Sequence, residues 1–186
     1  MRSFKMLVYL WLISNVSIYA QSKINSDGGR LNYPVPVKTE KLLFYIQRSF
    51  NKNTIAYELN LDHENKIIYG DPIHPYWIRY EDEGERKELS YIERKFAYGI
   101  KIEQQNKQDS SYQIALVSYP INMELKKSIE DNTMKVYITV NGKLIELKMI
   151  YFKTEGGTFW KPNIKYIDIF GFDVKTKLEI SERILP

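Results

Sequence analysis

The side chains best suited to hold a ligand are three arginines and two aromatic residues. Trp77 and Arg79 lie two residues apart, so an extended strand points both to one side. A guanidinium beside an indole ring binds anions or aromatic groups, but the same pair can be a cation-π contact that only ties neighbouring strands. We therefore take Arg48, Trp77, Arg79, Arg94 and Tyr98 as candidate ligand-binding residues and assign no catalytic residue.

Several chemistries have no motif in this sequence. There is no cysteine, and the Gly-x-Ser-x-Gly elbow, phosphate loop, dinucleotide fingerprint and His-Glu-x-x-His are all missing. The two histidines, His63 and His74, fall short of the three or four ligands that zinc takes, so we expect no metal site and no cofactor. A carboxylate pair for glycoside hydrolysis stays open, because its separation of about 5 to 9.5 Å is set by the fold. The nominal members of such a pair are Glu58, Glu93, Glu103 and Asp168.

The strand that carries Trp77 has two different faces. Tyr76, Ile78 and Tyr80 alternate with Trp77 and Arg79, which is the period of two that is typical of a strand. The pattern predicts that the first three side chains face the core. Trp77 and Arg79 are then expected on the opposite face.

Arg48 ends a strand of a predicted hairpin. Residues 42–48 and 54–61 both alternate, and the asparagines between them tolerate the left-handed backbone of a short loop. Arg48 shares the phase of Leu42, Phe44 and Ile46, so its guanidinium should reach the rim of the core, where it needs a partner. It is either a structural arginine or an anion-binding one.

A single short helix is predicted after residue 88. Ser90 and Glu93 have the spacing of a capping box, and Gly99 is expected to end the helix in the left-handed conformation. The apolar residues at helical spacing, which should pack on the sheet, are Leu89, Ile92 and Phe96.

The rest of the chain reads as β-strand. Asn141-Gly142 is the preferred dipeptide of a type I′ hairpin turn. The register that aligns both apolar faces pairs Val140 with Lys143, Ile138 with Ile145, Val136 with Leu147 and Met134 with Met149. We expect a mainly β fold, an antiparallel β-sandwich or barrel of eight to ten strands with one short α-helix.

The N-terminus has the pattern of a secretory signal peptide. Arg2 and Lys5 precede an apolar run that ends at Ala20. We expect a signal peptide over 1–20, a flexible leader over 21–36 and a single β-rich domain over 37–186, with no transmembrane segment in the mature chain. A cysteine-free exported protein suits a bacterial periplasm or the extracellular medium. The remaining charges are interspersed, which argues against a nucleic-acid partner.

Several short segments resemble a known family in the right order. They are Phe44-Tyr45-Ile46-Gln47-Arg48-Ser49, Asn53-Thr54-Ile55 with Tyr57-Glu58-Leu59, Pro72 with Tyr76-Trp77-Ile78, and Ile92-Glu93-Arg94 with Ala97-Tyr98-Gly99. In these the chain resembles an uncharacterised bacterial exported family, the domain of unknown function 4833, closely over 42–99 and less so beyond. The resemblance implies one exported domain and supplies no catalytic residues.

Two functions follow from these features. The favoured one is an exported, periplasmic or secreted, non-catalytic binding or structural module of the bacterial envelope. On this hypothesis the double exchange Trp77→Ala and Arg79→Ala abolishes binding and leaves stability nearly unchanged. The alternative is a hydrolase that acts on polysaccharide through a carboxylate pair. A barrel with an enclosed apolar cavity would favour a lipid-carrier version of the first hypothesis.

Overall fold

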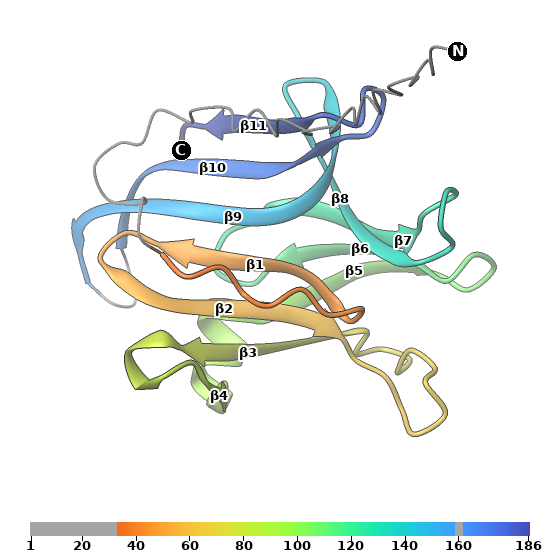
Figure 1. Cartoon of the computed structure of the whole chain (residues 1–186), viewed down its shortest axis with the longest axis horizontal. Coiled ribbons are helices and arrows are strands. Elements are labelled where there is room, and N and C mark those ends of the chain that lie inside the picture. Colours follow the sequence, from red (N-terminus) through yellow and green to blue (C-terminus); the bar gives the residue numbers. More distant parts are fainter. Residues whose placement is uncertain (1–32, 159–161) are drawn as a thin grey trace, which may run out of the picture.

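The computed structural model describes residues 33–158 and 162–186, and most of them form strands (Figure 1). Eleven strands are present in these ranges, one more than the most expected. They are β1 (Leu42–Arg48), β2 (Asn51–Leu59), β3 (Ile73–Arg79), β4 (Glu85–Glu88), β5 (Ile100–Asn106), β6 (Ser111–Leu116), β7 (Asn122–Lys127), β8 (Met134–Val140), β9 (Lys143–Gly157), β10 (Pro162–Asp173) and β11 (Glu179–Ile184). The helical segments are the 3-10 turn η1 (Tyr80–Asp82), the α-helix α1 (Tyr91–Glu93) and the π-helical turn η2 (Arg94–Tyr98). The prediction of a mainly β fold with one short α-helix is confirmed.

The long strand β9 organises the sheet. Its first residues pair antiparallel with β8, up to Glu146 opposite Tyr137. From Met149 to Phe152 the same edge pairs with β1 instead, and these two strands run parallel. β10 follows the other edge of β9. The sheet is therefore mixed, so the prediction of an entirely antiparallel sheet was wrong at β1 and β9.

The exchange of partners along β9 divides the sheet into two branches. The strand order is β4-β3-β2-β1-β9-β8-β7-β6-β5, so β1 to β4 form one branch and β5 to β8 form the other. Figure 1 shows β1 and β2 in front of β5 and β6. The side chains between the branches form one apolar core with members from both. The result is a single sheet that curls around its own core.

Aligned apolar side chains hold each branch together. In the second branch Ile114 lies opposite Met123, Met123 opposite Ile138 and Ile138 opposite Ile145, and all four are buried. Each such side chain contributes about 1.5 to 3 kcal/mol to folding relative to full exposure. The ladder explains why alternation in the sequence marks these strands so clearly.

The Asn141-Gly142 hairpin was predicted correctly near its turn. Asn141 has a φ of 50° and Gly142 a φ of 76°, as a type I′ turn requires. The pairs Val140 with Lys143 and Ile138 with Ile145 are confirmed. The pairing of Met134 with Met149 was wrong, because β9 has by then left β8 and Met149 lies opposite Tyr45 of β1.

Part of the expected flexible leader lies on the sheet. The Nε2 atom of the buried Gln47 donates a hydrogen bond to the Pro34 carbonyl at 2.9 Å, and the Tyr33 and Tyr151 rings lie 6.4 Å apart. The remainder of that segment, 21–32, and the predicted signal peptide over 1–20 lie outside the described residues. Within the described ranges, the helical segments are all too short or too polar to cross a bilayer.

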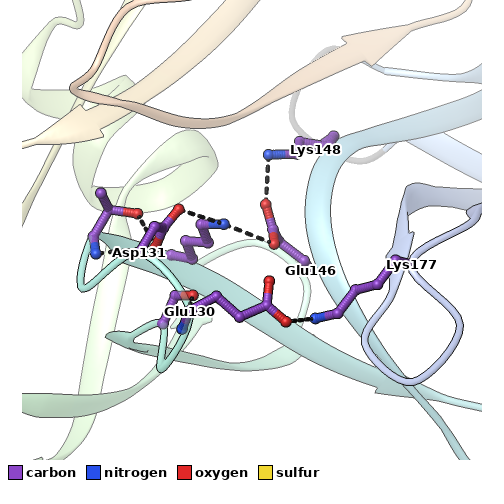
Figure 2. A network of polar contacts seen from close by, with 8 residues as sticks. Glu130, Asp131, Glu146, Lys148 and Lys177 are labelled. Atoms are coloured by element: carbon purple, nitrogen blue, oxygen red, sulfur yellow. Dashed lines mark hydrogen bonds and ion pairs between the residues drawn. The ribbon is translucent and has the colours of Figure 1, made fainter.

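A polar network fixes the outer face where β8 and β9 diverge (Figure 2). Lys135 on β8 lies 3.0 Å from both a carboxylate oxygen of Asp131 and one of Glu146 on β9. Glu130 forms an ion pair with Lys177 in the β10–β11 turn. The network thus joins the β7–β8 loop to two later segments of the chain.

The stability that Glu146 contributes should depend on pH. Burial raises the pKa of Glu146, but hydrogen bonds from Lys148 and Lys135 outweigh burial and lower that pKa overall. A lowered carboxyl pKa stabilises the fold above the ordinary value of about 4.3, and this contribution is lost as pH falls through the folded-state pKa. Urea unfolding between pH 3 and 7 should show that Glu146→Gln destabilises at pH 7 and that the effect shrinks toward pH 3. The matched control is Glu103→Gln, which removes an exposed carboxylate paired with Lys101. If Glu146→Gln lowered the free energy of unfolding by the same amount at every pH, the prediction would be contradicted.

Candidate functional site

Three of the five candidate binding residues meet where β1 and β3 end. The guanidinium carbon of Arg48 lies 5.3 Å from the centre of the Trp77 ring and 5.2 Å from that of the Tyr98 ring. The two rings meet edge to face with their centres 5.1 Å apart. Arg48 also donates a hydrogen bond to the Tyr98 hydroxyl. We call these three residues the arginine cluster.

The face assigned to Trp77 and Arg79 was wrong. Trp77 lies opposite Ile55 of β2, both belong to the core, and Trp77 is only 6% exposed. Tyr76 is buried on the outer face instead, where its hydroxyl donates to Glu58 at 2.7 Å. Both faces of β3 are thus largely covered, so an alternation of aromatic residues on both faces could not reveal which of them is the core.

Arg48 is a largely covered cation with aromatic partners. In the described ranges no carboxylate pairs with it, and its Nε atom is buried without a hydrogen-bond partner. The faces of Trp77 and Tyr98 offset part of the cost of covering the charge. Burial raises the pKa of Tyr98 and the nearby Arg48 lowers it, with a raised pKa as the net result, so the phenol is neutral near pH 7. The arginine cluster closes this end of the core.

The other two predicted arginines do not join the cluster's contacts. Arg79 pairs with Asp82 at 3.1 Å, and its Nε atom is buried without a hydrogen-bond partner in the described ranges. Arg94 lies 3.8 Å from a carboxylate oxygen of Glu88 on β4. Ligand binding by any of the five residues stays a prediction.

The helix before Tyr98 begins as predicted but ends differently. The capping box of Ser90 and Glu93 is confirmed. Ile92 and Phe96 were expected to pack on the sheet, yet they are 51% and 60% exposed. The wider π-helical turn η2 shifts the inward face by two residues, so Tyr98 is buried in place of Phe96.

Gly99 is required for a reason other than the expected one. Its φ of −68° is not left-handed, so the predicted left-handed helix end was wrong. A Cβ atom at this position would lie 2.0 Å from the Arg94 carbonyl oxygen. The close approach of the η2 backbone therefore excludes any side chain.

Each of the four nominal catalytic carboxylates has a partner of its own. Glu93 accepts hydrogen bonds from Ser90 and from the Trp77 indole, the latter at 3.2 Å. The other three pair with basic residues: Glu58 with Arg86, Glu103 with Lys101 and Asp168 with Arg183. None of the four lines the cleft at the opposite end of the molecule.

The cleft lies at the end of the core opposite the arginine cluster. The loop between β2 and β3, the turn between β5 and β6 and the start of β8 meet there, at the right in Figure 1. Its volume is about 650 Å³, within the usual range of ligand sites. The lining residues are Leu59, Leu61, Asn65, Lys66, Ile67, Tyr69, Gln105, Lys107, Ser110, Tyr112, Lys127 and Met134.

The cleft combines apolar and positively charged surfaces. Leu59, Ile67 and Met134 pack against the core and form an apolar floor. Lys107 and Lys127 also line the cleft, and no acidic residue is among its lining residues. The described residues place no carboxylate within ion-pair distance of either ammonium group. The cleft is therefore suited to a negatively charged ligand with an apolar part.

The other polar residues that line the cleft add no negative charge to it. Lys66 pairs with Glu64 at 2.6 Å, outside the lining itself. The Lys107 ammonium lies 5.2 Å from the centre of the Tyr69 ring. Burial and the neighbouring Tyr69 raise the pKa of Tyr112, so this phenol adds no negative charge near neutral pH. None of these residues was among the predicted binding residues.

The fold and the cleft define a curled, mixed β-sheet domain with a basic, apolar-floored cleft at one end. The chain belongs to the family described as "Domain of unknown function (DUF4833)", whose profile matches residues 44–183. The match begins in β1 and ends in β11, so it extends well beyond the segment in which the sequence resemblance is close. No significant match is found among curated proteins or among solved structures.

The burial of Trp77 reverses the stability expected for its replacement. Trp77→Ala removes a large buried side chain and should lower the free energy of unfolding by about 3 to 5 kcal/mol in urea titrations. Tyr91→Ala is the control, because Tyr91 is 73% exposed and its loss should change stability by no more than about 0.5 kcal/mol. Equal stability of the two variants would show that the indole does not contribute to the core.

Proposed function

We propose that this protein is a non-catalytic binding module of the bacterial envelope, and that the cleft between the β2–β3 loop and the β5–β6 turn holds an anionic ligand. One observation carries the proposal. Lysine side chains line a cleft of about 650 Å³ whose lining contains no acidic residue. Elsewhere in the described ranges, about half of the lysines lie within ion-pair distance of a carboxylate, as Lys101, Lys143 and Lys165 do.

The charge arrangement favours an anion for an elementary reason. Two opposite charges 4 Å apart attract by about 1 kcal/mol in bulk water and by about 4 kcal/mol in the effective dielectric of a protein surface. An anion at the rim would also balance the charges of Lys107 and Lys127, for which the described residues supply no carboxylate partner. Such an interaction is screened by salt, so binding should weaken as ionic strength rises.

Binding without catalysis is the better supported of the two functions. Hydrolysis of a glycosidic bond needs two carboxyl groups that face each other across the substrate. The nominal members, such as Glu58 and Asp168, are engaged with arginines outside the cleft. The proposed module therefore recognises its ligand and does not transform it.

An envelope location rests on the N-terminal sequence. Arg2 and Lys5 followed by an apolar run to Ala20 form the pattern that export machinery reads, and a chain without cysteine needs no disulfide in an oxidising compartment. We place the module in the periplasm or outside the cell.

Removal of the unpaired ammonium groups should weaken anion binding. We expect the double variant Lys107→Gln and Lys127→Gln to bind the fluorescent sulfonate 8-anilinonaphthalene-1-sulfonate about tenfold more weakly than the unmodified protein, equivalent to about 1.4 kcal/mol. Stability should not change. Fluorescence titration at low and high salt provides the measurement.

The matched control removes two exposed lysines away from the cleft, Lys52→Gln and Lys87→Gln. This double variant changes the net charge by the same amount as the cleft double variant and should bind the sulfonate as tightly as the unmodified protein does. Equal weakening in both double variants would mean that net charge, and not the cleft, attracts the anion.

The location can be tested directly. When residues 1–186 are expressed in a bacterium, the protein should appear in the periplasmic fraction or the medium with Gln21 as its first residue, as mass spectrometry of the intact chain would show. A chain that starts at residue 21 should stay in the cytoplasm. Retention of the full-length chain in the cytoplasm with its first 20 residues attached would contradict export.

A further inference from the structure

We infer that the ligand of the cleft is a single-chain amphiphile, with a negatively charged head at the lysines and a hydrocarbon chain that enters the seam between β5 and the start of β3. This inference rests on the proposed function of the same cleft. It adds the chemical class of the ligand and the path of its apolar part.

The seam exists because the curled sheet does not close. The strand order ends at β4 on one side and β5 on the other, and α1 with η2 connects these two edges. No backbone hydrogen bond in the described ranges joins β5 to the loop over 60–72. Side-chain packing alone therefore holds the two edges together along this line, so a guest can separate them without breaking a hydrogen-bonded ladder.

A second cavity lies in this seam. It has a volume of about 170 Å³ and is lined by Gly70, Asp71, Pro72, Ile73, Ile100 and Ile102. The larger cleft is lined by the same two elements further along, by Ile67 and Tyr69 of the loop and by Gln105 of β5. Both cavities thus follow β5, one near its beginning and the other at its end.

Apolar side chains line both cavities, and the lysines stand only at the larger one. Lys107 and Lys127 stand at the cleft, and Leu59 and Met134 form its floor. Ile73, which is only 2% exposed, lines the second cavity together with Ile102 and the exposed Asp71. Methionine is flexible and adapts to guests of different shape. This order of charges and apolar groups matches an amphiphile whose head remains at the surface.

A polar anion such as a sugar acid or a nucleotide would fit the lysines but not the apolar floor of the cleft. Its hydroxyl groups would lose water against Leu59, Ile67 and Met134 without gaining hydrogen bonds, which costs free energy. A hydrocarbon chain gains about 0.8 kcal/mol for each methylene group that leaves water. The apolar floor therefore selects the chain, and the lysines select the head.

Chain length is the variable that tests the inference. Octanoate, decanoate and dodecanoate, each below its micelle concentration, should displace the fluorescent sulfonate with affinities that rise roughly fourfold per methylene group, the equivalent of 0.8 kcal/mol. Dodecanol lacks the charge and should bind at least about tenfold more weakly than dodecanoate. Dodecyl phosphate in place of dodecanoate distinguishes a phosphate head from a carboxylate head.

The seam itself can be tested with a unique label, because the chain contains no cysteine. Dodecanoate should slow the reaction of the Ile102→Cys variant with N-ethylmaleimide at least about fivefold, and acetate should leave it unchanged. Ile180→Cys is the matched control, since Ile180 is also partly buried but lies on β11, outside both cavities. Its reaction should not respond to dodecanoate.

Failure of the amphiphile, failure of the path along the seam and failure of the proposed function give different results. If the sulfonate binds through the lysines but affinity does not depend on chain length, the amphiphile is wrong and the anion-binding function stands. If dodecanoate binds without protecting the Ile102→Cys variant, the path along the seam is wrong. If neither the sulfonate nor any alkanoate binds, the proposed function fails with the inference.

Discussion

The parallel pairing of β1 with β9 is the constraint on which the rest of the structure depends. One edge of β9 has hydrogen-bonding groups for two strands, and β8 uses the first part while β1 uses the second, from Met149 to Phe152. Because β1 and β8 leave the same edge at different points, the strands that follow each of them form separate branches. The core is what these branches enclose when they curl toward each other.

This geometry makes the two ends of the core unequal. At one end β1 and β3 bring Arg48 and Trp77 to Tyr98, and the stacked side chains leave little room. At the other end the β2–β3 loop of one branch meets the β5–β6 turn of the other, and the cleft lies between them. Since β4 and β5 stay unpaired with each other, the sheet does not close into a barrel, and the cleft lies beside the open edge of β5. The same partner exchange thus explains both the closed end and the open one.

Local signals in the sequence predicted local structure well. The Asn141-Gly142 turn and the Ser90 capping box depend on residues a few positions apart, and both are present. Alternation identified the strands, but it could not show which face of β3 met the core, because both faces carry aromatic residues. The parallel pair joins residues about a hundred positions apart, and backbone hydrogen bonds leave no mark on residue type. The cleft was missed for the same reason, since its lysines come from separate elements that only the strand order brings together.

In the described ranges neither Arg48 nor the two cleft lysines Lys107 and Lys127 have a carboxylate partner, but their surroundings differ, and the difference decides which should attract a ligand. The Arg48 guanidinium is covered by two rings and bonded to a phenol, so an incoming anion would first have to displace packed aromatic groups. Lys107 and Lys127 reach the same cleft from flexible stems, and an anion there displaces only water. The arginine cluster therefore stabilises the fold and its closed end, while the lysine-lined end keeps its positive potential available to a partner from solution.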